Sequence, residues 1–132
     1  MIPGWGGCAR LPRLIGAQAA VAHMLKAALV PAAAALKAGL VDEVVPVAEL
    51  KTRAKAVALR LSAEGLPNRA VPAAAPADFF ASQRQTARTR MRGQPAPLAM
   101  LDAVEQGAAL SVAAALTISS MRLVPSTTEN SV

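Results

Sequence analysis

Aromatic residues are nearly absent from this sequence, which has one tryptophan, two phenylalanines and no tyrosine among 132 residues. Much of its 54% hydrophobic content is alanine. Alanine favours helices but buries little apolar area per residue, so helices form more readily than a core that holds them together. We therefore expect a mostly helical chain with one modest core.

Cysteine and histidine occur once each, as Cys8 and His23. A single cysteine excludes an intrachain disulfide and fits a reducing compartment. One cysteine and one histidine also cannot form a metal site, so no metal is expected. We interpret Cys8 as a small residue of a loop, with a catalytic thiol activated by a base as the alternative. We interpret His23 as an ordinary surface or interface residue.

Long apolar runs are also missing. The longest, residues 27–36, contains Pro31 and is far shorter than the roughly 20 residues that span a bilayer. Met1 leads into a Pro-Gly segment rather than a basic stretch and an apolar run, so no signal peptide is expected. We therefore expect a cytoplasmic protein without membrane contact.

Basic residues outnumber acidic ones, and the formal net charge is +6. This balance suits phosphate-bearing ligands, including coenzyme A, nucleic acids and anionic membranes, without choosing between them. Arg84, Arg88 and Arg92 are spaced by four and share one helix face. That stripe is either a solvated face or a contact for a phosphate or partner. No aromatic residues interleave it, which makes nucleic-acid binding the weaker alternative.

Acidic residues offer two candidate pairs for acid–base chemistry. Asp42 and Glu43 are adjacent in an extended segment, so their side chains point to opposite faces. Asp102 and Glu105 share a helix face. We assign structural or solvated roles to both pairs and expect no catalytic residue in the chain.

Hydrophobic periodicity, glycine and proline divide the chain into predicted elements. Residues 1–16 are expected to form a loop and residues 40–46 an extended segment. Helices are expected at 17–29, 31–39, 47–63, 77–92, 98–107 and from about 108 to 118. The helix at 47–63 should turn four apolar residues inward, namely Leu50, Ala54, Val57 and Leu61.

The first sixteen residues carry a recognisable motif. Residues 2–16 read Ile-Pro-Gly-Trp-Gly-Gly-Cys-Ala-Arg-Leu-Pro-Arg-Leu-Ile-Gly. They resemble the I-P-G-x-G-G-T-x-R-L-P-R-L-x-G signature of the enoyl-CoA hydratase/isomerase (crotonase) family. Cys8 and Ala9 replace the usual threonine and polar residue.

Two further motifs follow in order. Residues 35–46, Ala-Leu-Lys-Ala-Gly-Leu-Val-Asp-Glu-Val-Val-Pro, resemble the segment that ends the crotonase core. Just before it, residues 25–27 read Leu-Lys-Ala where crotonases usually have Leu-Thr-Gly. Residues 92–107 are similar to the R-G-x-Y-P-A-P-x-x-x-x-D-A-V-E-x-G stretch of the multifunctional fatty-acid oxidation complex alpha subunit, without its aromatic residue.

The resemblance implies that this chain is mostly α-helical and forms the carboxyl-terminal helical part of a truncated α/β crotonase (ClpP/crotonase-like) fold. At most one or two short strands are expected. It implies a fragment of a hydratase/isomerase (a lyase or isomerase) of fatty-acid beta-oxidation, acting on acyl-CoA thioesters without a separate cofactor. Its domains would be the end of the crotonase core (1–65), a Pro/Ala-rich linker (66–76), linking helices (77–118) and a disordered tail (119–132).

The resemblance also implies what the chain does in isolation. Both catalytic glutamates and the oxyanion hole correspond to positions before Ile2, so the chain alone is expected to be inactive. Gly4 corresponds to a glycine whose backbone N–H contacts the catalytic water, or it merely permits the turn. The alternatives are a basic helical module that binds nucleic acid and an assembly module that docks onto crotonase-type subunits or forms homo-oligomers.

Overall fold

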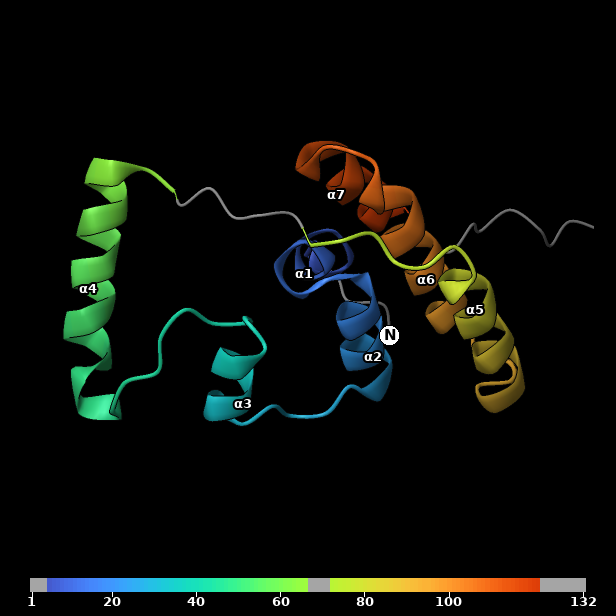
Figure 1. The fold of residues 1–132 in the computed structure, drawn as a ribbon, viewed down its shortest axis with the longest axis horizontal. Helices are drawn as coiled ribbons and strands as arrows, with labels where there is room; N and C mark the ends of the chain where they lie inside the picture. Colours follow the sequence, from blue (N-terminus) through green and yellow to red (C-terminus); the bar gives the residue numbers. More distant parts are fainter. Residues whose placement is uncertain (1–4, 67–71, 122–132) are drawn as a thin grey trace, which may run out of the picture. The chain divides into compact units, whose positions relative to one another are not determined.

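The computed structural model describes residues 5–66 and 72–121, and this part of the chain contains seven helices and no strand (Figure 1). The prediction of a mostly helical chain is confirmed. The helices are α1 (Gly7–Ile15), α2 (Ala17–Lys26), α3 (Ala32–Lys37), α4 (Val47–Glu64), α5 (Phe79–Arg90), α6 (Pro95–Ala108) and α7 (Val112–Met121).

The helices belong to two compact units. One unit combines Met1–Ala28 with Pro72–Val132, and the other is Leu29–Val71. The first unit therefore joins α1 and α2 to α5, α6 and α7, which lie far away in the sequence. The second unit contains α3 and α4.

Helix α6 is the centre of the first unit, where it packs against α1, α2, α5 and α7. Its fully buried residues are Leu101, Ala103 and Val104, and they meet Val21 of α2 and Cys8 of α1 in one core. Leu98 also packs on this core. The helix predicted at 98–107 thus corresponds to α6, which joins segments that are far apart in the sequence.

Helix α1 was not predicted, because residues 1–16 were expected to be a loop. Its sequence has glycine at the start and Pro12 inside, both unfavourable for a helix. The helix nevertheless buries Cys8 and Ala9, which are at most 1% exposed. Burial of this face against α6 and α2 outweighs the poor intrinsic propensity.

Helix α4 agrees with its predicted range but not with its predicted burial. None of its residues is buried, and Leu50, expected to face inward, is 56% exposed. Ala54 is exposed, whereas Val57 and Leu61 are half-buried. The expectation of an inward apolar face on this helix is therefore wrong within the described residues of this unit, where only the irregular segment that contains Val45 lies beside that face.

The rest of the second unit is small. Ala35 of α3 is its buried residue, and Leu40 to Pro46 run without regular structure. The Nε atom of Arg53 on α4 donates to both carboxylate oxygens of Glu43, at 2.7 and 2.9 Å. This ion pair links the irregular segment at 40–46 to α4.

The predicted domain boundaries at 65, 76 and 118 stay predictions. The linker at 66–76 includes residues 67–71, which lie outside the described residues. Of the predicted tail, 119–121 continue α7 and 122–132 lie outside the described residues. No helix in the described part of the chain is both long and apolar enough to cross a membrane.

Candidate functional site

The first motif forms a tight turn into α1. Gly6 has φ 85°, a left-handed conformation that favours glycine, and its carbonyl accepts the backbone N–H of Arg10 at 2.9 Å. A Cβ on Gly6 would overlap the Leu116 side chain of α7. The Arg10 guanidinium donates to the Trp5 carbonyl at 2.6 Å. The turn is thus specified by close packing as well as by backbone conformation.

Gly4, the candidate water-site residue, lies outside the described residues, and its role stays a prediction. Its neighbour Trp5 is 99% exposed and has φ 58°.

Cys8 occupies a buried helical position rather than the loop that was predicted. It is 1% exposed, and desolvation by burial raises the pKa of its thiol. A raised pKa lowers the thiolate fraction, and the thiolate is the reactive form. The structure therefore favours a packing role for Cys8 over a catalytic one.

Arg84 connects α5 to α6. Its Nε and Nη2 atoms donate to Asp102 Oδ1 at 3.0 and 2.7 Å, and Nη2 also donates to Glu105 Oε2. The hydrogen bond that Arg84 donates to Glu105, followed by those that it donates to Asp102, raises the pKa of Arg84. The structural role predicted for Asp102 and Glu105 agrees with this geometry.

The same network separates Arg84 from the rest of the arginine stripe. Its side chain is 23% exposed and its charge is paired, whereas Arg88 and Arg92 are exposed. Arg92 follows the end of α5 at Arg90, so the prediction that all three arginines share one helix face is wrong for Arg92. Arg84 is therefore not part of a solvated face, and it is not free to bind phosphate. This arrangement does not favour the nucleic-acid alternative.

Arg13 connects the first motif to the third. Its Nη2 atom donates to the Gly107 carbonyl at 2.9 Å and to the Leu110 carbonyl at 2.6 Å, and its Nη1 atom donates to the Ala9 carbonyl. Gly107 is in the last turn of α6, where carbonyls have no partner within the helix. A cation at this end also interacts favourably with the helix dipole.

Ala27 ends α2 in an unusual conformation. It has φ 48°, and its N–H donates to the His23 carbonyl at 3.1 Å. This is the position where crotonases usually have glycine, the residue that adopts such a conformation without strain. The substitution noted in the sequence therefore leaves a strained alanine at the helix end.

No three histidine, cysteine, aspartate or glutamate residues gather into a possible metal site within residues 5–66 and 72–121. The expectations of no metal and no cofactor stay predictions.

A comparison with protein families decides the class of this chain. The family model for enoyl-CoA hydratase/isomerase matches residues 1–93. The chain belongs to the enoyl-CoA hydratase/isomerase family. The match covers α1 to α5 and both of the first two motifs, whereas most of the third motif follows it.

The packing of this hydratase/isomerase chain includes residues that its sequence did not single out. Arg13 was part of a quoted motif, but nothing in the sequence indicated that it would reach Gly107, 94 positions away. The replacement of glycine by Ala27 was visible and could have indicated strain.

Proposed function

We propose that this chain is the carboxyl-terminal part of the hydratase/isomerase module of a fatty-acid oxidation complex alpha subunit. The family match at residues 1–93 supports the module. The similarity of residues 92–107 to the alpha-subunit stretch supports the subfamily. The observation that carries the proposal is the bond from Arg13 to Gly107, because it unites the first and third motifs in one packed unit.

The parent reaction in this proposal is hydration of a 2-enoyl-CoA. Such a reaction needs acid–base groups for the water and the proton, and hydrogen-bond donors for the developing enolate oxygen. In the resembling family two glutamates and two backbone N–H groups supply these functions, and none of them corresponds to a position in this chain.

Three acids of the described residues are paired with arginines and are poor substitutes for those glutamates. Asp102 and Glu105 bind Arg84, and Glu43 binds Arg53. We therefore propose that the chain alone has no hydratase activity and needs no separate cofactor. We further propose acyl-CoA as the ligand of the complete module and the cytoplasm as its location.

The apolar face of α4 supports a docking role within this proposal. Leu50 on this face is 56% exposed, and no residue of the helix is buried. Exposed apolar surface is unfavourable in water and is commonly covered by a partner. We propose that this face packs on the remaining part of a crotonase-type subunit.

Complementation tests the proposal. The purified chain is assayed for hydration of crotonyl-CoA, alone and after co-expression with the amino-terminal part of a hydratase module that carries both glutamates. We expect activity only from the combination. A chain variant with Leu50→Ser and Val57→Ser should reduce recovery, whereas Lys51→Ser and Lys55→Ser should not.

Hydration by the repurified chain alone would contradict the proposed inactivity. A combination that assembles but stays inactive would contradict the proposed place of this chain in the module.

A further inference from the structure

The apolar face of α4 has the residue spacing of a seam between two helices. Its members alternate intervals of three and four residues, and they are Val47, Leu50, Ala54, Val57 and Leu61. This is the a/d pattern by which one helix packs along another at a small crossing angle. Val47 is 89% exposed, whereas Val57 and Leu61 are half-buried. We call these five residues the α4 seam.

The α4 seam borders a groove of about 360 Å³. One side of the groove is α4, and the other is the irregular segment that contains Asp42, Glu43 and Val45. The exposed surface of the groove is mostly apolar. Its acidic groups are already engaged, because Glu43 is paired with Arg53 and Asp42 is not without a partner. The groove therefore favours an apolar occupant that leaves these groups in place.

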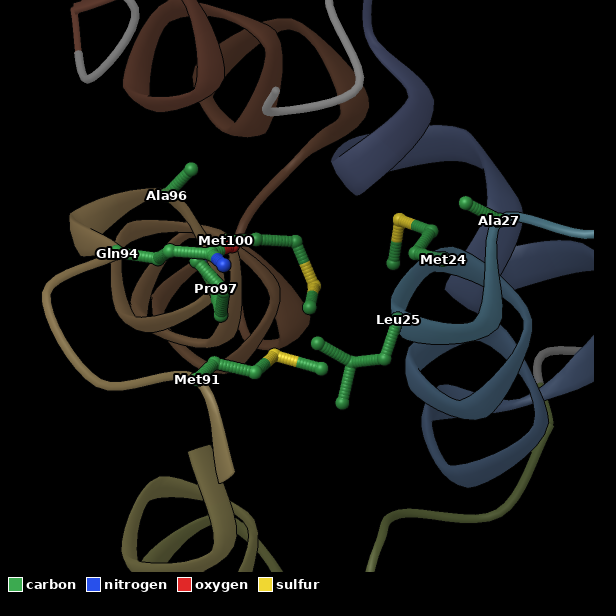
Figure 2. A pocket seen from close by; sticks show the side chains of 8 residues that line it. All are labelled: Met24, Leu25, Ala27, Met91, Gln94, Ala96, Pro97 and Met100. Carbon is green, nitrogen blue, oxygen red and sulfur yellow. The ribbon is translucent and has the colours of Figure 1, made fainter. Parts of the chain in front are cut away.

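A hollow in the first unit differs from this groove. It measures about 200 Å³ and is lined in part by three methionines from α2, the turn after α5 and α6, namely Met24, Met91 and Met100 (Figure 2). Its exposed lining is as polar as it is apolar. It thus offers no apolar surface comparable to the α4 seam.

The side chains that flank the α4 seam carry charge of one sign. Next to the a and d positions, α4 has two residues on each side, namely Lys51 and Ala58 on one side and Arg53 and Arg60 on the other. Lys51 and Arg60 are exposed. The acidic residues of the helix, Glu49 and Glu64, occupy other positions. The seam is therefore an apolar stripe between basic flanks.

These two features select the occupant. The a/d spacing matches a helix, because a strand presents one face every second residue. The basic flanks attract acidic residues, and they repel a second copy of α4, whose own flanking positions carry no acid. We propose that the α4 seam binds an amphipathic helix whose apolar stripe is flanked by glutamate or aspartate. This inference rests on the proposed function, and it places that helix in the remaining part of the crotonase-type subunit.

The length of the seam sets the length of its partner. From Val47 to Leu61 the seam runs about 21 Å, at about 1.5 Å per residue, so the partner helix contributes about four turns. A seam this short does not sustain a free coiled coil, which needs about three heptads or more. The pairing therefore forms as one contact within a larger subunit and is weak for an isolated helix.

Two helical peptides test the charge of the partner. Both have about 18 residues with leucine at the a and d positions, and one carries glutamate at the flanking positions where the other carries lysine. Backbone amide NMR of the whole chain measures the binding of each. We expect signal shifts in α4 and residues 42–45, and about tenfold tighter binding of the glutamate peptide in low salt. High salt should reduce this preference.

Charge reversal on the chain supplies a matched control. Lys51→Glu combined with Arg60→Glu should make the lysine peptide the tighter binder. Arg88→Glu combined with Arg90→Glu changes the net charge equally but lies on α5, and should leave the preference unchanged. Reversal is the sharper change, because neutralisation of Lys51 alone alters affinity only about twofold.

Two leucines of α4 test the apolar part of the seam. Leu50→Ser should weaken the binding of both peptides about tenfold. Leu59 is 63% exposed but lies outside the seam, and Leu59→Ser should keep affinity within about twofold. The thermal melt of each variant verifies that it is folded.

Equal binding of the two peptides, signal shifts away from α4, or an unchanged preference after charge reversal on α4 would overturn the proposal. Self-association of the chain that Leu50→Ser abolishes, measured by sedimentation, would identify a second copy as the occupant instead. Recovery of hydration by complementation does not require this charge preference. The proposed function can therefore hold where this inference fails, and the two failures are distinguishable.

Discussion

The guanidinium of Arg13 binds the carbonyl of Gly107 at 2.9 Å, although the two residues are 94 positions apart. Through this bond, α1 supplies a charged cap to the end of α6. The Gly107 carbonyl also accepts the backbone N–H of Leu110 at 3.2 Å, so Arg13 adds a second, charged donor at this helix end.

Removal of this cap should destabilise the chain. Arg13→Gln cannot reach the carbonyls of Gly107 and Leu110 together, and we expect a loss of about 2 kcal/mol in the free energy of unfolding. Chemical denaturation followed by circular dichroism measures it.

Arg10→Gln is the matched control on the same helix, because Arg10 is exposed and its side chain binds the Trp5 carbonyl. We expect a loss of about 0.5 kcal/mol or less for this variant. Equal losses for the two variants would show that the hydrogen bonds of Arg13 contribute no more to stability than the exposed hydrogen bond of Arg10.

The arginine stripe should divide into a structural and a solvated part. Arg84→Gln breaks the ion pairs with Asp102 and Glu105 and should lower the free energy of unfolding by about 1 kcal/mol, since the pairs are partly exposed. Arg88→Gln should change it very little. A double-mutant cycle of Arg84→Gln with Asp102→Asn measures the coupling, and additive effects would contradict the pairing.

Replacement of Ala27 by glycine should stabilise the chain. Glycine adopts the φ of 48° without the clash that an alanine Cβ introduces, and we expect a gain of about 1 kcal/mol. Ala28→Gly is the control at the next position and should give no gain. Thermal melting of both variants checks the expectation, and a destabilised Ala27→Gly chain would show that this conformation is not the one in solution.

Stability should decline in alkaline solution because of Cys8. Burial raises the pKa of this thiol above its ordinary value of 9.0. Below about pH 9 the thiol is protonated in the folded and unfolded chains alike, so its burial carries no ionisation penalty. Above that pH the unfolded chain releases the proton while the folded chain retains it, and the free energy of unfolding falls as the pH rises.

Denaturation at pH 7 and pH 10 compares the original chain with Cys8→Ala. The alanine variant should lose less stability between the two pH values, although it starts lower because of the cavity. Identical losses in both chains would contradict a buried thiol at this position.

Several parts of the fold were accessible from the sequence alone. Local periodicity predicted α2, α4, α5 and α6 to within a few residues, because the pattern of apolar residues is a property of each segment. Three ordered motifs also indicated the family that the match at residues 1–93 shows. The scarcity of aromatic residues indicated a small core.

Tertiary packing decided the rest. Helix α1 contains Pro12 and forms because its buried face meets α6, which no local pattern at residues 7–15 expresses. The opposite holds for α4, whose amphipathic sequence predicted burial that its unit does not provide. The capping of Gly107 by Arg13, the pairing of Arg84 with Asp102 and the grouping of three methionines join distant residues. Sequence alone indicated most of the helices and the family. The contacts between distant segments required the three-dimensional structure, because periodicity describes which face of a helix is apolar and not what that face meets.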